Sequence, residues 1–242
     1  MNTILEIKNF SKAYDSDKNA VNNISLTVNQ GEIYGFIGHN GAGKSTTIKS
    51  IVGILPVRKG EIIVDGTNIN MNTAACQKKI AYIPDNPDLY EFMTGLDYIN
   101  FIADVFEIST EERTKQIKKY SDAFEITKYL RNLIGSYSHG MKQKIALIAA
   151  FVHQPKLLVL DEPFVGLDPK ASVILKKCMR ELCDNGSAIF FSTHVLEVAE
   201  VLCDKVGIMN HGNLVVSGTV KELTKDKNLE QIFLENIEEE HE

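Results

Sequence analysis

The sequence contains no tryptophan, only four cysteines and no apolar run long enough to span a bilayer. The cysteines form no C-x-x-C pair and no metal-binding spacing with the histidines, which favours reduced thiols in a cytosolic protein. The first residues lack the charged start and the apolar stretch of a signal peptide. Lysine and arginine together number 26 against 32 acidic residues, and the net charge of −6 argues against a body that binds nucleic acid. Any attachment to a membrane should therefore depend on a partner.

The composition is otherwise that of a soluble globular protein, with 44% hydrophobic and 24% charged residues. A chain of 242 residues suffices for one large domain or two small ones. Segments rich in β-branched residues at 3–10 and 20–28 predict strands. Farther along, short apolar strands at 156–160, 188–192 and 205–209 alternate with helices at about 171–183 and 195–202. This alternation indicates an α/β domain with a largely parallel sheet.

A helical block interrupts that sheet. Helical periodicity extends from about residue 94 to 129, and a long apolar helix follows at about 141–153. We expect a single domain over 1–242, with a nucleotide-binding α/β core at 1–87 and 155–218 and a helical subdomain at 88–154. Residues 219–242 predict a helical tail, in which apolar residues recur at helical spacing: Leu229, Ile232, Phe233 and Ile237.

Residues 38–45 read GHNGAGKS and fit the pattern G-x-x-x-x-G-K-[ST] of a phosphate-binding P-loop. An apolar strand precedes the segment and a helix follows it, as the motif requires; an accidental match is expected on the order of 1% of the time. Its glycines let backbone N–H groups, together with the positive end of the helix dipole, surround a polyphosphate. Lys44 would contact the β- and γ-phosphates, and Ser45 would ligate Mg²⁺. The predicted nucleotide-binding residues of this stretch are Gly38, His39, Asn40, Gly41, Ala42, Gly43, Lys44, Ser45 and Thr46.

Two adjacent carboxylates end the apolar strand at 156–160. Alone, such acids would most often cap a helix or face solvent in a loop. After a P-loop, Asp161 is suited to holding Mg²⁺, directly or through water. Glu162 is suited to orienting or deprotonating an attacking water.

With the segment YSHGMKQ at 137–143 also in view, the sequence resembles the ATP-binding cassette (ABC) ATPases over nearly its whole length. Residues 138–141 stand where the family has its LSGGQ signature, 166–168 where it has its D-loop, and 192–194 where it has its switch histidine. The motifs occur in the family's order. The resemblance implies a P-loop NTPase fold of ABC type: a mostly parallel sheet core, an N-terminal antiparallel β part and an inserted helical subdomain.

The resemblance also implies roles for residues that the patterns alone leave open. Tyr14 stands where the family has an aromatic that stacks on adenine; otherwise an edge-strand tyrosine would be the simpler interpretation. His194, otherwise an ordinary loop histidine, would contact the γ-phosphate and position Glu162.

Other implied roles require a second chain. Ser138 and the N–H of Gly140, at the start of a helix, would face the γ-phosphate held by a partner subunit. Asp168 would meet the opposite subunit near its P-loop. Each ATP would then lie between one chain's P-loop and the other's signature, so dimerisation would be part of the mechanism.

Two residues depart from the family's pattern. Asp85 stands where the family usually has the Q-loop glutamine, and it still supplies an oxygen for Mg²⁺, directly or through a water. His139 replaces the first of two signature glycines, which costs backbone freedom. A histidine there could add pH sensitivity, or its side chain could point away.

These residues predict an active ATPase that uses ATP and Mg²⁺. Lys44 would hold the phosphates, and Glu162 would act on the water while His194 steadies it. Such an ATPase could be a subunit of a membrane transporter. Its partners would then be a second ABC ATPase subunit and a separate integral membrane subunit. The block at 85–106 lies where such ATPases receive a coupling helix, and the tail resembles that of exporter ATPases. The chain would then lie in the cytoplasm, peripheral on the inner face of the cell membrane. The alternative is a soluble ABC ATPase acting on nucleic acid, the ribosome or protein assembly.

Overall fold

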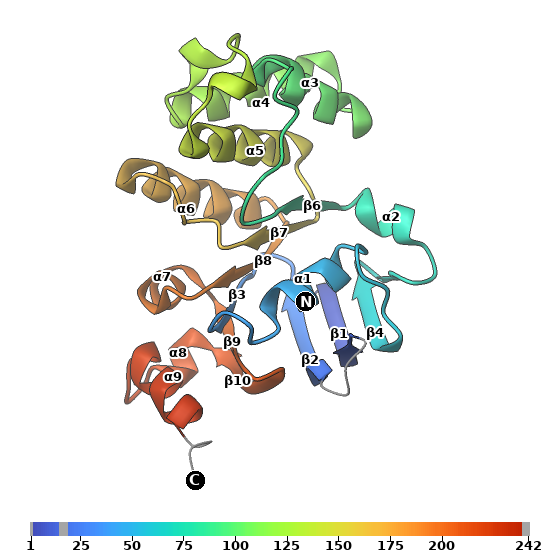
Figure 1. Ribbon diagram of the computed structural model, residues 1–242, viewed down its shortest axis with the longest axis vertical. Coiled ribbons are helices and arrows are strands. Elements are labelled where there is room, and N and C mark those ends of the chain that lie inside the picture. Colours follow the sequence, from blue (N-terminus) through green and yellow to red (C-terminus); the bar gives the residue numbers. More distant parts are fainter. Residues whose placement is uncertain (1, 15–18, 239–242) are drawn as a thin grey trace.

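The computed structural model describes residues 2–14 and 19–238. They form two sheets (Figure 1). The N-terminal sheet is antiparallel, and its order β2-β1-β4-β5 comprises β2 (Asn19–Asn29), β1 (Thr3–Ala13), β4 (Lys59–Val64) and β5 (Thr67–Asn68). The larger sheet has the order β10-β9-β3-β8-β7-β6 and comprises β10 (Asn213–Thr219), β9 (Lys205–Asn210), β3 (Ile33–Gly38), β8 (Ala188–Thr193), β7 (Leu157–Asp161) and β6 (Ile80–Ile83). All neighbours in the larger sheet are parallel except β10, which pairs antiparallel with β9.

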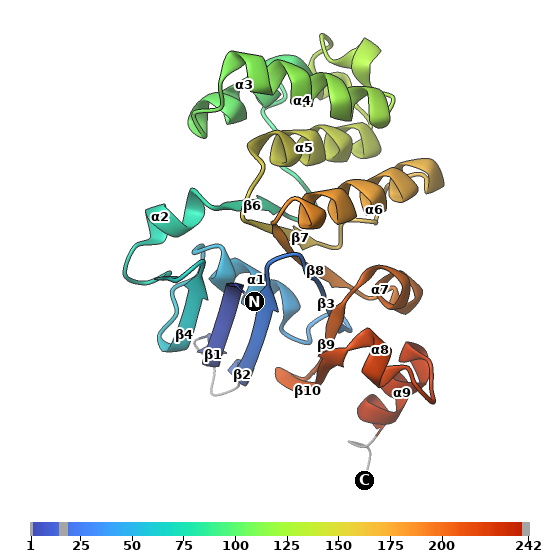
Figure 2. The same ribbon diagram turned by 180° about the vertical axis from the view of Figure 1, so that it is seen from behind.

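The helices lie in layers around these sheets. They are α1 (Lys44–Ile51), α2 (Thr73–Gln77), α3 (Gly95–Val105), α4 (Thr110–Ala123), α5 (His139–His153), α6 (Pro169–Asp184), α7 (Leu196–Leu202), α8 (Val220–Leu223) and α9 (Leu229–Glu238). Figures 1 and 2 show α3, α4 and α5 stacked at one end of the molecule, and α8 and α9 at the other end. The predicted fold class is confirmed: a mostly parallel sheet, an N-terminal antiparallel part and a helical insert.

The central strands β3, β7 and β8 are buried along their whole length, because helices cover one face of the sheet and the N-terminal sheet together with α1 covers the other. Their continuously apolar sequences are typical of such strands. On the side of the N-terminal sheet, Phe36 and Tyr34 pack against Phe190 with ring centroids 5.1 and 5.6 Å apart. This rigid core fixes where the carboxyl ends of β3, β7 and β8 lie, and the site is built there.

The helical stretch expected at 94–129 is broken in the structure. Helix α3 ends at Val105, and Glu107 adopts a left-handed backbone with φ 58°. Ser109 then caps α4, since its Oγ accepts a hydrogen bond from the backbone N–H of Glu112 at 3.2 Å. A short 3₁₀ turn at Thr127–Tyr129 completes the stretch.

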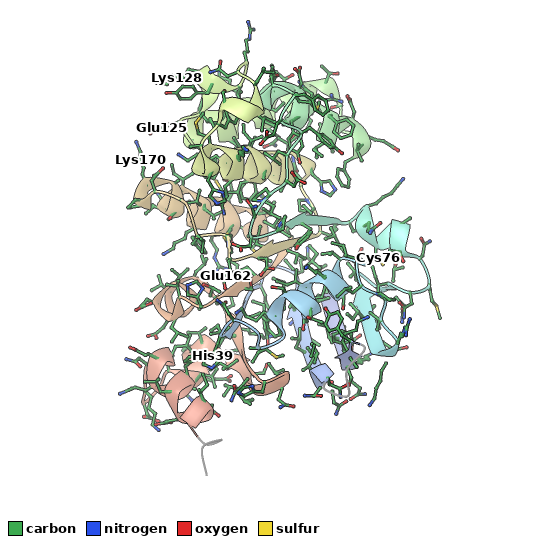
Figure 3. The ribbon with its side chains drawn as sticks, viewed as in Figure 1. His39, Cys76, Glu125, Lys128, Glu162 and Lys170 are labelled. Atoms are coloured by element: carbon green, nitrogen blue, oxygen red, sulfur yellow. The ribbon has the colours of Figure 1, made fainter. Side chains whose placement is uncertain are left out.

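Ion pairs join the helical layer to α6. Lys170 pairs with Glu125, labelled in Figure 3, and Lys119 pairs with Glu181. All four side chains are exposed, so these pairs contribute little to stability. Across residues 2–14 and 19–238, the helices all lack the length or the apolar character needed to cross a bilayer.

Candidate active site

The P-loop connects β3 to α1 at the carboxyl edge of the larger sheet. Gly41 and Gly43 adopt φ values of 85° and 106°, a region that other residues avoid. A Cβ on Gly43 would also lie 2.5 Å from the carbonyl oxygen of Ala20. The loop therefore requires its glycines, and it presents its backbone at the start of α1.

Lys44 is 6% exposed, and its ammonium group points back along the loop. Its Nζ donates to the carbonyl oxygens of Gly38 at 2.6 Å and His39 at 3.1 Å. It also lies 3.7 Å from Glu162 Oε1. Burial lowers the pKa of Lys44, and the carboxylates of Glu162 and Asp161 oppose that shift. A cation is thus held at the centre of the site.

The two acidic residues at the end of β7 are held by Ser192 of β8. Ser192 Oγ donates to Asp161 Oδ1 at 2.5 Å and accepts from the backbone N–H of Glu162 at 3.0 Å. Glu162 adopts φ 48°, which turns the chain sharply after the strand. His194 Nδ1 lies 3.0 Å from Glu162 Oε2. This is a histidine–carboxylate pair next to Lys44.

These groups surround a cavity of about 330 Å³, lined by Ala20, His39, Asn40, Gly41, Gly43, Lys44, Ser45, Thr46, Asp85, Asp161 and Glu162. Ser45, Asp85 and Asp161 thus present oxygen atoms to one space, the donor type that Mg²⁺ prefers. Within residues 2–14 and 19–238, no set of three or more His, Cys, Asp or Glu side chains could hold a metal by itself.

Tyr14 lies at the edge of the P-loop helix. Its hydroxyl is 3.2 Å from Thr46 Oγ1, and about half of the side chain is exposed. The ring is therefore close to the site and accessible to a ligand.

Ser138, Gly140 and Asp168 do not line this cavity in the described part of the chain. Ser138 caps α5, accepting from the backbone N–H of Met141 at 3.3 Å, and Gly140 lies in the first turn of that helix. Asp168 caps α6, and its carboxylate accepts from Ala171 N at 2.8 Å and Lys144 Nζ at 3.0 Å. The helix cap and Lys144 lower the pKa of Asp168.

Comparisons with known proteins give the family of this chain. Residues 21–165 match the family model described as "ABC transporter". The ABC-type transporter ATP-binding protein EcsA of Bacillus subtilis (strain 168) is 34% identical over 242 residues, covering 98% of each chain. The lipopolysaccharide export system ATP-binding protein LptB of Escherichia coli (strain K12) is 32% identical, covering 95% of this chain and 96% of LptB. A solved structure described as the ATP-binding subunit of an ABC transporter superposes with a TM-score of 0.92 at 33% identity, covering 96% and 99% of the two chains.

This chain belongs to the ABC transporter ATPase family. It is an ABC-type ATPase, and its P-loop connects strand β3 to helix α1.

In this ABC ATPase the departure at His139 has a visible consequence. The His139 ring lies close against Gly166: a Cβ added to Gly166 would be only 2.6 Å from His139 Cδ2. Gln143 Nε2 donates to the carbonyl oxygen of Pro163 at 2.9 Å. The start of α5 therefore packs on the loop at 163–168, which carries Asp168.

Sequence reasoning overlooked two contacts of the ABC ATPase site. The sequence places Ser192 only in the segment of the switch histidine, yet its hydroxyl donates to the Asp161 carboxylate and accepts from the backbone N–H of Glu162. The sequence did carry a signal for Ser192, because it is a polar residue at the end of an apolar strand, where the acidic residues of β7 also lie. The contact between the rings of His39 and Phe233 had no local signal, because the two residues are far apart in the sequence.

A second hollow lies between the helical layer and the edge strand β6. It measures about 360 Å³ and is mainly apolar, with walls that include Tyr82, Leu89, Tyr98, Ile102, Phe106 and His153. Beside it, exposed aromatic rings pack together: Tyr90 lies 5.8 Å from Phe92 and 5.9 Å from Phe101 between centroids. Phe92 is 79% exposed.

Proposed function

We propose that this chain is the ATP-hydrolysing subunit of a membrane transporter, and that ATP-driven closure of an ATPase dimer is coupled to a separate transmembrane subunit. In this assignment residues 1–87 and 155–218 form the nucleotide-binding core. Residues 88–154 carry the signature and the docking surface, and 219–242 form a tail.

ATP occupies the cavity at the P-loop. Its phosphates lie against the backbone of 38–46, where the start of α1 favours an anion. Phosphate oxygens then replace the carbonyl oxygens of Gly38 and His39 as partners of Lys44. Tyr14 is exposed beside Thr46 and stacks on the base.

Mg²⁺ is held with the phosphates by Ser45 and Asp161, and by Asp85 directly or through a water. The ion neutralises negative charge on the phosphates. Ser192 keeps the Asp161 carboxylate oriented toward the cavity. Asp85 stands where the family usually has the Q-loop glutamine, and its carboxylate adds one more negative charge to the lining of the cavity.

Hydrolysis uses water as the nucleophile. Glu162 accepts a hydrogen bond or proton from that water, and His194, 3.0 Å from the same carboxylate, steadies it at the γ-phosphate. Lys44 lines the same cavity and stabilises the negative charge on the γ-phosphoryl group as it is transferred to water.

A second chain completes the site. In the described part of the chain, Ser138, Gly140 and Asp168 do not line the chain's own cavity, and we assign them to the ATP held in a partner's P-loop. Two chains arranged in this way bury two ATP molecules, and ATP binding draws the dimer together.

The observation that carries the transporter assignment is the apolar hollow at β6 with its exposed aromatic cluster. Aromatic side chains exposed beside an apolar groove are typical of a docking site for an amphipathic helix. A cytoplasmic helix of a transmembrane subunit fits this surface and would hold the chain at the inner face of the membrane. Export is the proposed direction, supported by the likeness to the ATP-binding protein of a lipopolysaccharide export system.

The test is purification of the tagged chain from detergent-solubilised native membranes, with bound proteins identified. We expect a stoichiometric polytopic membrane protein. Phe92→Asp should remove it, whereas Val201→Asp, at a site 81% exposed on α7, should retain it. Recovery only from the soluble fraction, with ribosomes, nucleic acid or assembly factors, would overturn the assignment.

A further inference from the structure

Helix α9 is anchored next to the site. Leu229 at its start is fully buried, and its backbone N–H donates to Glu200 Oε2 of α7 at 2.8 Å. Two residues before its end, the carbonyl oxygen of Asn236 accepts from Asn210 Nδ2 at the end of β9, at 3.5 Å. Strand β9 pairs with β3, and Met209 lies opposite Gly38, the first P-loop residue. The helix thus packs where the P-loop begins.

Phe233 of α9 contacts the P-loop through His39. Its ring centroid lies 5.3 Å from that of His39, with an interplanar angle of 60°, an edge-to-face arrangement. Phe233 is also partly buried against the core. Figure 3 labels His39 beside the C-terminal helices.

This contact lies in the part of the P-loop, residues 39–41, that is exposed to solvent. His39, Asn40 and Gly41 are exposed, and a Cβ on Gly41 would meet no atom within 4 Å. The carbonyl of His39 accepts from Lys44 Nζ at 3.1 Å and from the backbone N–H of Ala42 at 3.2 Å. The position of the His39 residue therefore bears on both the loop backbone and the Lys44 ammonium group.

We propose that Phe233 is a positioning residue for ATP: through the His39 ring it holds the first half of the P-loop in its phosphate-binding form. A loop that is already ordered loses less conformational freedom on binding. Removing the ring should therefore weaken nucleotide affinity more than it slows the chemical step. The tail then contributes to the nucleotide site of its own chain.

The test is the affinity of the purified full chain for a fluorescent ATP analogue, with KM and kcat for ATP hydrolysis. An aromatic pair is worth enough to weaken binding about two- to tenfold when it is lost. Phe233→Ala should raise Kd and KM by that factor with kcat little changed, and Phe233→Tyr, which keeps the ring, should restore both. Leu234→Ala, at the neighbouring half-exposed position of α9, is the matched control and should bind as wild type.

The His39→Ala background shows whether the effect passes through His39. In that background Phe233→Ala should add no further loss of affinity. If Phe233→Ala is too unstable to purify, Phe233→Leu keeps apolar packing without the ring and should show the same weakening. Wild-type affinity in Phe233→Ala or Phe233→Leu, or an equal loss in both His39 backgrounds, would overturn the proposal. The measurement needs no membrane subunit, so its failure would leave the transporter assignment untouched.

Discussion

Ser192 on β8 donates its hydroxyl hydrogen to Asp161 Oδ1 at the end of β7, at 2.5 Å. The two residues are paired in the parallel register of β7 and β8. The same hydroxyl accepts from the backbone N–H of Glu162 at 3.0 Å. One side chain therefore sets the direction of the proposed Mg²⁺ ligand, Asp161, and the backbone position of the proposed general base, Glu162.

Ser192→Ala should lower both stability and turnover. Asp161 is buried, and a buried carboxylate that loses a hydrogen bond costs about 1–3 kcal/mol. Urea unfolding and ATPase assays measure the two effects. Ser187→Ala is the matched control, because its buried hydroxyl donates to Pro155 O at 2.6 Å at the opposite end of β8. That variant should lose stability but keep kcat, and a Ser192→Ala variant with wild-type kcat would contradict the role given to Ser192.

His153 should make stability depend on pH. Burial lowers the pKa of His153 below 6.5, against the opposing effect of its hydrogen bond to Lys78 O. As the pH falls below 6.5, the unfolded chain takes up a proton that the folded chain does not. The free energy of unfolding should therefore fall in this range, and less steeply in His153→Gln. Identical pH profiles from chemical unfolding of the two proteins would show that His153 does not cause the loss.

Gly166→Ala should destabilise the loop that carries Asp168. The residue has φ 79°, and a Cβ would meet the His139 ring at 2.6 Å. Gly66→Ala is a matched control, since Gly66 has φ 76° and an added Cβ would meet nothing within 4 Å. The backbone strain alone should cost about 1–3 kcal/mol at either position, and Gly166→Ala should cost more. In a His139→Ala background the two costs should become equal; a difference that persists would mean that His139 is not the obstacle.

Much of this architecture could be predicted from local patterns. The P-loop motif identified the turn where Gly41 and Gly43 adopt positive φ, and the apolar run at 156–160 identified the strand that delivers Asp161 and Glu162. Such signals are local, because a buried parallel strand is a continuous apolar run and a phosphate loop needs glycine at fixed positions. The break between α3 and α4 was missed, since helical periodicity on both sides of Glu107 hides a left-handed residue.

Contacts between distant segments could not be predicted in the same way. The hydrogen bond between Ser192 and Asp161 depends on the register of β7 and β8, which no single segment reveals. The packing of Phe233 on His39 depends on how the tail folds back over β9. The helical spacing of the tail predicts an apolar face but does not say which surface it covers.

The central claim is that Glu162, with His194 beside it, drives ATP hydrolysis at the P-loop cavity of a closed dimer. The most direct measurement is ATP turnover and oligomeric state of purified Glu162→Gln, with Glu197→Gln, an exposed acid on α7, as the control. Loss of a general base should slow hydrolysis by about 10²–10⁴-fold, while ATP still binds and brings two chains together in light scattering. Glu197→Gln should hydrolyse ATP as wild type. Full turnover by Glu162→Gln would contradict the account.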